Sequence, residues 1–476
     1  MTKRFLTLLL ILPLLFCCKG NKENPTDNTG TTDPTDPEGF VVVDKALDGE
    51  AWADAAPQIR HGQTYRANSE ITEKYLNEVN YPDKDLSFTK IFDYEGWGYD
   101  GKTYHWVEKS SGSYTYEPTP WPDGDKPASY SIRWETGEDA NSGLITVHLE
   151  DKLDWKANID VKSGSAYVNI TSLVPNDEYT YSAVAGNGKI LAQGTFKTSG
   201  NLHQVFFKTK CRNARDLGGW TTTDGKKIKY RKVYRGGRMN DPWETMLNKE
   251  GKQEVLMEGI GAELELRGSD DLVKKPAVDG LDHCVPIIEE GGKVMLGVHK
   301  PSNYNCAKWL KFDVKREDMV NKTKEELKDY VPTAKELEDF QDAYKAKTKQ
   351  CFEFVLNSVK AGKGCYFHCS LGRDRTGTMA VLIMGILGVR EGDISKEYEL
   401  TYFAPMGFSV SSSDYLSNPQ LKFQNTREHW VYSDIVPYFW GLSTDGTFKS
   451  GVEKYLNEIA GVPMEEITEF RNLMLE

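Results

Sequence analysis

One short segment of the chain carries residue types that can bind and attack a phosphate ester. It reads His368-Cys369-Ser370-Leu371-Gly372-Arg373-Asp374-Arg375-Thr376-Gly377, with an arginine six positions after the cysteine and a threonine directly after that arginine. A cysteine thiolate is a strong nucleophile, and the planar guanidinium of arginine can hold two phosphoryl oxygens at once. This spacing predicts a loop in which both groups face one phosphate.

Apolar runs on either side predict the elements that position this loop. Residues 364–367 form a short run typical of a buried strand, and residues 379–389 form a longer run typical of a helix. The loop therefore lies at a helix N-terminus, where backbone N–H groups lack intrahelical partners and the macrodipole favours an anion. A thiol in such a position has a pKa lowered to roughly 3.5–7.5, so we expect Cys369 to be ionised at neutral pH.

The loop residues then have expected roles in phosphate-ester chemistry. Cys369 is expected to attack phosphorus, and Arg375 to hold two equatorial oxygens. Thr376 is placed to hydrogen-bond the sulfur when it leaves. This chemistry requires no metal and no other cofactor. A buried structural cysteine beside a helix cap is the alternative for an isolated cysteine, but it does not account for the arginine and the threonine. The expected substrate-binding residues of the loop are Ser370, Leu371, Gly372 and Arg373.

The loop and several other segments resemble a known family. His368 to Gly377 are similar to the signature His-Cys-x-x-Gly-x-x-Arg-Ser/Thr-Gly of the cysteine-dependent protein tyrosine phosphatase superfamily. This resemblance implies an α/β fold with a tyrosine phosphatase-like central sheet flanked by helices, and phosphomonoester hydrolysis through a cysteinyl-phosphate intermediate. Similarity to the bacterial atypical tyrosine/lipid phosphatase branch extends to Asn213–Trp220, Tyr234–Gly237, Glu265–Arg267 and Asp393–Leu400. Together the matches run from about residue 205 to the C-terminus.

The resemblance also implies a general acid inside the loop, at Asp374. A carboxylate at this position also stabilises a helix N-terminus, and the two roles are compatible. Many tyrosine phosphatases instead carry the acid on a Trp-Pro-Asp loop, and Trp121-Pro122-Asp123 matches that motif. Because this match lies far upstream of Cys369, in a stretch rich in proline and glycine, we interpret it as a coincidence.

Four residues outside the loop are further candidates for substrate binding. Basic side chains near the loop suit a phosphorylated substrate, particularly in a chain whose net charge is −12. The alternative is structural, because an ion pair between Arg215 and Asp216 could brace the turn at Gly218-Gly219. The four candidates are Arg215, Asp216, Arg235 and Arg267.

The sequence leaves the substrate open among a phosphorylated protein, an inositol phosphate and a phosphoinositide. The chain has Arg373 where the atypical branch usually has Lys, at a position that the resemblance links to phosphoinositide binding. Because this residue differs, the resemblance does not imply specificity for a lipid substrate. A lipoprotein that binds phosphorylated or glycan ligands without turnover is the alternative from another class. The intact Cys369, Arg375 and Thr376 argue against it. The acidic balance argues against a nucleic-acid partner.

The first residues predict a lipoprotein signal peptide over residues 1–17. Lys3 and Arg4 precede an apolar run over residues 5–15 that is too short to span a bilayer. The end of this run resembles a bacterial lipobox with Cys18 as the lipidated residue. Residues 18–39 are rich in Asn, Thr, Asp, Pro and Gly and are expected to be a disordered tether. We therefore expect a protein anchored by lipid to the inner or outer membrane of a bacterial cell envelope, outside the cytoplasm.

The region between tether and phosphatase predicts an all-β sandwich over residues 127–200. Residues 130–134, 145–149, 166–170 and 179–184 alternate apolar and polar side chains, as half-buried strands do. Residues 173–181 and 194–198 resemble the E–F corner and last strand of a fibronectin type III-like domain, in which a tyrosine hydroxyl anchors the corner. Residues 40–126 remain without an assigned fold, and residues 201–476 form the expected catalytic domain.

Three further expectations concern the catalytic domain. Residues 333–336 match a capping box that opens a helix leading toward the loop strand. Residues 404–425, rich in Ser, Pro and Gly, are a candidate lid or substrate wall. The chain is expected to close with two amphipathic helices broken at residues 461–463.

Overall fold

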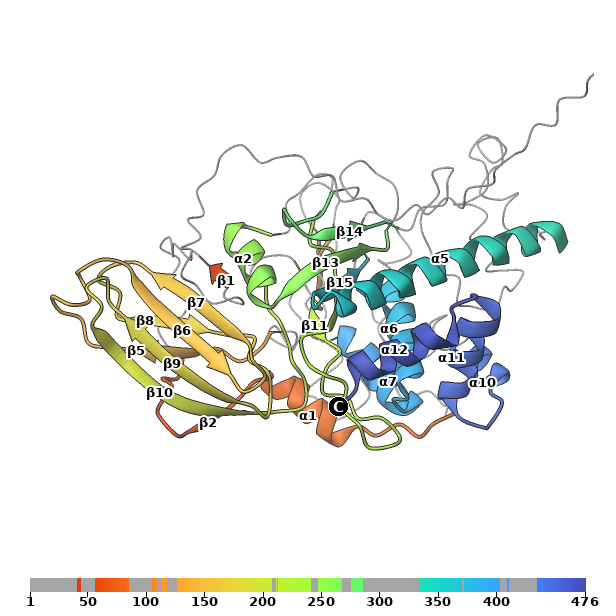
Figure 1. The fold of residues 1–476 in the computed structure, drawn as a ribbon, viewed down its shortest axis with the longest axis horizontal. Helices are drawn as coiled ribbons and strands as arrows, with labels where there is room; N and C mark the ends of the chain where they lie inside the picture. Colours follow the sequence, from red (N-terminus) through yellow and green to blue (C-terminus); the bar gives the residue numbers. More distant parts are fainter. Residues whose placement is uncertain are drawn as a thin grey trace, which may run out of the picture.

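The two largest sheets of the described residues have six and five strands (Figure 1). Their buried side chains belong to separate hydrophobic cores. The structure is a computed structural model that describes residues 41–43, 56–84, 105–108, 114–117, 126–207, 211, 213–240, 247–267, 275–285, 334–369, 372–402, 409–410 and 435–476. In Figure 1 the strands of the first sheet lie on the left, and the second sheet lies near the centre with most of its helices on the right.

The first sheet has the strand order β1-β7-β6-β9-β10-β2. Its strands are β1 (Val41–Val43), β2 (Thr64–Arg66), β6 (Ile145–Asp151), β7 (Lys156–Val161), β9 (Glu178–Val184) and β10 (Ile190–Ser199). A separate ribbon of β5 (Tyr130–Arg133) and β8 (Tyr167–Ile170) shares its core, which includes Ile132, Val147 and Phe196. Burial alternates along β6, β8 and β9. The strands predicted in this region are therefore confirmed.

The boundary predicted at residue 127 does not coincide with the edge of this sheet. β1 pairs in parallel with β7, and β2 pairs in parallel with β10, although both come from the region left without an assigned fold. Each of the two strands has three residues, which is too short for an alternating pattern to be visible. Their place in the sheet is decided by pairing with strands far along the chain.

A hairpin from the same N-terminal region pairs with the segment predicted as a candidate lid. β3 (His105–Glu108) and β4 (Tyr114–Glu117) are antiparallel, and β4 also pairs with β16 (Ser409–Val410). The rest of residues 404–425 lies outside the described residues.

The second sheet is mostly parallel, with the order β11-β12-β15-β13-β14. Only β11, at one edge, runs antiparallel to its neighbour. The central strand β15 therefore ends at the same edge as β12 and β13, since the carboxyl ends of parallel strands meet there. The strands are β11 (Arg215–Asp216), β12 (Val233–Gly236), β13 (Ile260–Glu265), β14 (Asp282–Cys284) and β15 (Gly364–His368).

Helices cover both faces of this sheet. Cys365 and Phe367 of β15 belong to a core shared with α5 (Ala334–Lys360), α6 (Asp374–Leu387) and α12 (Met464–Met474). Tyr366, between them in sequence, joins a smaller core on the opposite face with Val255 of α2 (Lys249–Met257). The predicted α/β architecture, with a central sheet flanked by helices, is confirmed.

The last helices also follow the sequence pattern. α10 (Val436–Leu442) and α11 (Phe448–Lys454) precede a π-helical turn, η5 (Tyr455–Ile459). α12 then begins after Gly461, whose φ of 74° suits glycine, and after Pro463, so the predicted break at residues 461–463 is confirmed. No helix among the described residues is both long enough and apolar enough to cross a membrane.

The helix α1 (Glu70–Glu78) connects the N-terminal segment to the helices beside the second sheet. Ser69 caps its N-terminus by accepting a hydrogen bond from Thr72 N. The hydroxyls of Tyr75 and Tyr81 donate to Glu399 Oε2 at 2.7 and 2.5 Å. Glu399 is the last residue of α7 (Glu391–Glu399), the helix that follows α6 in the chain. Residues before the first sheet's main strands therefore pack directly on α7.

The corner predicted around residue 179 is present. Tyr179 is fully buried, and its hydroxyl accepts a hydrogen bond from Val174 N at 2.8 Å. Replacing Tyr179 by Phe leaves this buried N–H without its partner, which costs about 1–3 kcal/mol. We therefore expect Tyr179→Phe to lower the free energy of unfolding by that amount in denaturant titrations. Tyr181→Phe, which removes a hydroxyl from the same strand, is the control. Equal effects of the two changes would contradict the anchoring role.

Candidate active site

The signature loop begins where the central strand ends. Cys369 directly follows β15 and is only 3% exposed, and α6 begins at Asp374. Arg373 precedes the helix, and its side chain does not cap the first turn. The predicted strand, loop and helix are thus arranged in that order around the cysteine. Ser370 and Leu371 lie outside the described residues, as does the side chain of Asp374.

Gly372 fits the loop closely against the neighbouring strand. Its φ is +69°, a conformation that favours glycine. A Cβ at this position would lie 2.4 to 2.7 Å from backbone atoms of Gly236 and Gly237, at the end of β12. Because such contacts cannot be relieved by rotating a side chain, no larger residue fits here without moving the backbone.

Arg375 connects the loop to the other neighbouring strand. Its Nη1 donates to the carbonyl oxygens of Leu266 and Arg267, both at 3.1 Å, directly after β13 ends. Thr376, one residue on, is fully buried, and its Oγ1 has no hydrogen-bond partner within the part of the chain that the structure describes. A buried hydroxyl usually has a partner, so this one is available to a group that enters the site.

A second cysteine near the loop shows what distinguishes Cys369. Cys365 lies four residues earlier, inside β15, and is fully buried. Burial raises the pKa of the Cys365 thiol to about 12, so this thiol stays protonated. Cys365 is inside the strand, whereas Cys369 lies between the end of the strand and the start of α6.

An ion-pair network lies under the loop on β13 and β15. His368 is fully buried, with Nε2 2.8 Å from Glu263 Oε1 and 3.7 Å from Glu265 Oε2. Burial lowers the pKa of His368, but the two carboxylates outweigh it and the net shift is upward. Burial likewise raises the pKa of Glu265, but His368 and Arg267 lower it by more.

These three residues also have the types and proximity of metal ligands. The ligand atoms of Glu263, Glu265 and His368 lie within 4.8 Å of one another. However, Glu263 Oε2 accepts from Ala277 N at 2.6 Å, and both oxygens of Glu265 accept from Arg267. The oxygens are thus already engaged in hydrogen bonds, which accounts for their burial without a cation.

Arg267, predicted to bind substrate, lies at the loop edge of β13. Its guanidinium holds Glu265 and also donates to Asn240 Oδ1 at 2.8 Å, while its carbonyl accepts from Arg375. The structure therefore brings Arg267, Arg375 and the loop together. A direct contact of Arg267 with substrate stays a prediction.

The structural alternative for Arg215 and Asp216, an ion pair between the two, does not hold, because Arg215 pairs with another carboxylate. Asp216 does brace the turn, because it accepts from Gly218 N at 2.8 Å and from Arg231 N at 2.5 Å. Arg215 instead pairs with Glu397 of α7, with Nε 2.7 Å from Oε1. The reason is geometric, since adjacent residues of β11 point to opposite faces of the sheet.

Arg235, in the neighbouring strand β12, contacts the loop through the carbonyl of Gly372. It is fully buried, donates Nη1 to Glu397 at 2.8 and 3.0 Å, and donates Nη2 to the carbonyl of Gly372. Asn213 Nδ2 donates to the same carbonyl at 3.1 Å. Sequence reasoning named Arg235 but missed Glu397. Glu397 lies in α7, a helix of mostly polar residues, so no local sequence signal distinguished it.

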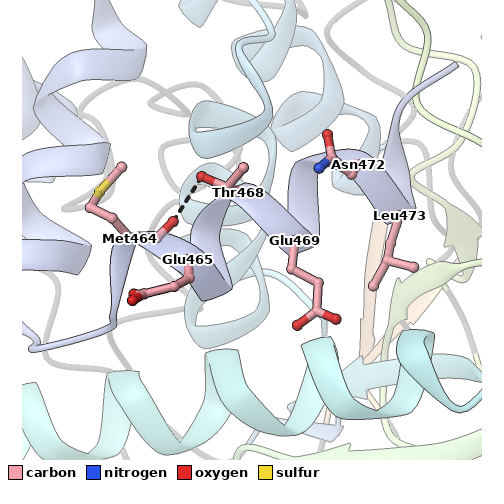
Figure 2. Close-up of a pocket in the computed structure, with 6 residues that line it drawn as sticks. All are labelled: Met464, Glu465, Thr468, Glu469, Asn472 and Leu473. Carbon is pink, nitrogen blue, oxygen red and sulfur yellow. Dashed lines mark hydrogen bonds between the residues drawn. The ribbon is translucent and has the colours of Figure 1, made fainter.

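A surface groove of about 610 Å³ lies away from this site (Figure 2). It is lined by Met464, Glu465, Thr468, Glu469, Asn472 and Leu473, all of α12. Figure 2 shows Glu469 pointing toward α5, where it pairs with Lys360 at 2.6 Å. None of the loop residues lines this groove.

Comparison with known proteins agrees with the geometry. Residues 208–476 match the tyrosine phosphatase family, and the chain belongs to it. A protein of Cupriavidus necator, named as a putative tyrosine-protein phosphatase, is 26% identical over 199 residues, which are 41% of this chain and 62% of that protein. The chain thus spans less than two thirds of that relative's length.

Proposed function

We propose that the protein hydrolyses phosphomonoesters through a phosphate bound covalently to Cys369. The observation that carries this proposal is the position of Cys369 between the end of the central strand and the start of α6. The first turn of α6 also holds the buried hydroxyl of Thr376, which has no hydrogen-bond partner among the described residues. The backbone N–H groups of such a helix start stabilise both a thiolate and a bound phosphate.

The reaction has two steps. The Cys369 thiolate attacks phosphorus, the bond from phosphorus to the leaving oxygen breaks, and that oxygen takes a proton from Asp374. Water then attacks phosphorus and gives a proton to the Asp374 carboxylate, the S–P bond breaks, and the sulfur leaves as a thiolate that accepts a hydrogen bond from Thr376. Arg375 and the loop amides stabilise the charge on the equatorial oxygens in both steps.

The proposed substrates are a phosphorylated protein, an inositol phosphate or a phosphoinositide. Arg267, Arg373 and Arg375 supply positive charge around the loop, and this favours an anionic substrate without choosing among the three. Turnover efficiency on a phosphotyrosine peptide, phosphoinositide vesicles and inositol hexakisphosphate would distinguish them.

The regions before the catalytic domain have proposed roles in holding that domain at a membrane surface. We propose that Cys18 carries a lipid, that residues 18–39 tether the protein to a membrane of the cell envelope, and that residues 127–200 with their added strands form a fibronectin type III-like spacer. The tyrosine corner at Tyr179 supports the last assignment.

The nucleophile is tested by Cys369→Ser. We expect this variant to bind phosphate or vanadate but to release no product, because a serine hydroxyl is far less ionised than a thiol. Rapid acid quench of the wild-type enzyme during turnover should recover phosphate on Cys369 by mass spectrometry. Cys365→Ala, four residues away, is the control and should retain turnover. Wild-type-like rates for the serine variant would exclude the mechanism.

The acid is tested by Asp374→Asn. Loss of a general acid slows substrates with poor leaving groups by about 10²–10⁴-fold, while activated aryl phosphates suffer much less. We expect this pattern when kcat is measured on alkyl and on nitrophenyl phosphates. Asp123→Asn, in the remote Trp-Pro-Asp match, should leave kcat nearly unchanged on both substrates. If instead Asp123→Asn slows the alkyl phosphates and Asp374→Asn does not, the general acid is Asp123.

The anchor is tested by metabolic labelling with a fatty-acid probe in a bacterial host. Wild-type protein should be labelled, Cys18→Ala should not, and Cys17→Ala should remain labelled. Label that persists in Cys18→Ala would place the lipid elsewhere.

A further inference from the structure

The carbonyl of Gly372, within the signature loop, is held by two buried donors. Arg235 Nη2 and Asn213 Nδ2 both donate to it. The Gly372–Arg373 peptide is trans, so the N–H of Arg373 points away from Arg235, off the opposite side of the loop. Because Arg373 directly precedes α6, this N–H is among the donors that a bound anion can use.

Arg235 is in turn held by a single carboxylate. Its Nη1 lies 2.8 and 3.0 Å from the two oxygens of Glu397. Arg215 approaches the same carboxylate with Nε at 2.7 Å, and donates from Nη2 to the backbone carbonyl of Glu397 at 2.6 Å. Arg215 also donates to Asn213, so both donors to the Gly372 carbonyl depend on this arrangement.

The cluster is buried, and its charges depend on one another. Arg215, Arg235 and Glu397 are each at most 3% exposed. Burial and then the nearby Arg235 lower the pKa of Arg215 to about 9, partly offset by Glu397. Burial raises the pKa of Glu397, but the two guanidiniums lower it by more. Without the Glu397 charge, two cations would face each other with little water to screen them.

We infer that Glu397 is a positioning residue for phosphoryl transfer: by holding Arg235 and Arg215 it orients the Gly372–Arg373 peptide so that the Arg373 N–H donates to the phosphoryl oxygens. Glu397 itself touches no reacting atom. Its effect passes through Arg235 to the carbonyl and across a rigid peptide plane to the N–H. This inference rests on the proposed hydrolysis at Cys369.

The same helix offers a matched control. Glu399, two residues later, is also a fully buried carboxylate, and it accepts hydrogen bonds from Tyr75 and Tyr81 of the N-terminal segment. Glu399 holds the N-terminal segment, whereas Glu397 holds Arg235, the donor to the Gly372 carbonyl. We therefore expect a change at Glu399 to weaken the packing of α7 without releasing the loop peptide directly.

The test uses the full chain and orthovanadate, whose five-coordinate form on a thiolate resembles the transition state. For Glu397→Gln we expect kcat/KM and vanadate affinity to fall together by about 10- to 100-fold, since loss of one preorganised donor costs on this order or more. For Glu399→Gln we expect a lower Tm but a vanadate Kd within about twofold of wild type. Calorimetry gives the Kd without requiring turnover.

Arg235→Lys keeps the proposal testable if Glu397→Gln does not fold. Lysine retains the charge but lacks the planar guanidinium that donates to the Glu397 carboxylate and to the Gly372 carbonyl at the same time. We therefore expect the same loss of vanadate affinity. If every folded variant loses vanadate affinity only in proportion to its loss of Tm, including Glu399→Gln, Glu397 is merely structural and the inference is overturned. Absence of turnover in the wild type, with vanadate binding still sensitive to Glu397, would instead reject the proposed hydrolysis alone.

Discussion

The site depends on one buried charge cluster, in which Glu397 lies between Arg215 and Arg235 beside the Gly372 carbonyl. Each of these side chains would be costly to bury alone, because a desolvated charge loses several kcal/mol of hydration. Together they satisfy one another, and their remaining donors reach the backbone of the loop. The loop therefore takes its shape from residues of β11, β12 and α7 as well as from its own ten residues.

The same dependence extends to the N-terminal half of the chain. α7 carries Glu397 and Glu399 two residues apart, within one turn of the helix, and Glu399 is held by Tyr75 and Tyr81. Gly392, at the start of α7, is so close to Tyr81 that a Cβ there would lie 1.9 Å from the Tyr81 carbonyl oxygen. The segment around α1 is thus packed into the phosphatase half rather than appended to it.

The first sheet is joined to the phosphatase half through buried polar contacts as well. Arg231, next to β12, pairs with Asp151 of β6, and its guanidinium lies over the ring of Trp155 at 4.5 Å. Trp155 Nε1 donates to the carbonyl of Met257 at 2.7 Å, at the end of α2. Since buried polar groups need specific partners, these contacts fix one arrangement of the two sheets more sharply than apolar packing alone would.

Much of the site could be predicted from sequence because its signals are local. The order of strand, cysteine loop and helix is encoded in about thirty consecutive residues, in which apolar runs and glycines mark each boundary. Gly372 and the strands around Tyr179 were predictable for the same reason. The expectation that Cys369 attacks a phosphate ester also came from those residues alone.

Only the tertiary structure decided which distant residues support the loop. Neither the pairing of Arg215 with Glu397 rather than Asp216, nor the addition of β1 and β2 to the first sheet, has a local pattern to reveal it. Both depend on contacts between residues more than a hundred positions apart. Which of these contacts form depends on which charges are buried together and which strands pair in the folded chain. Neither can be predicted from local sequence patterns.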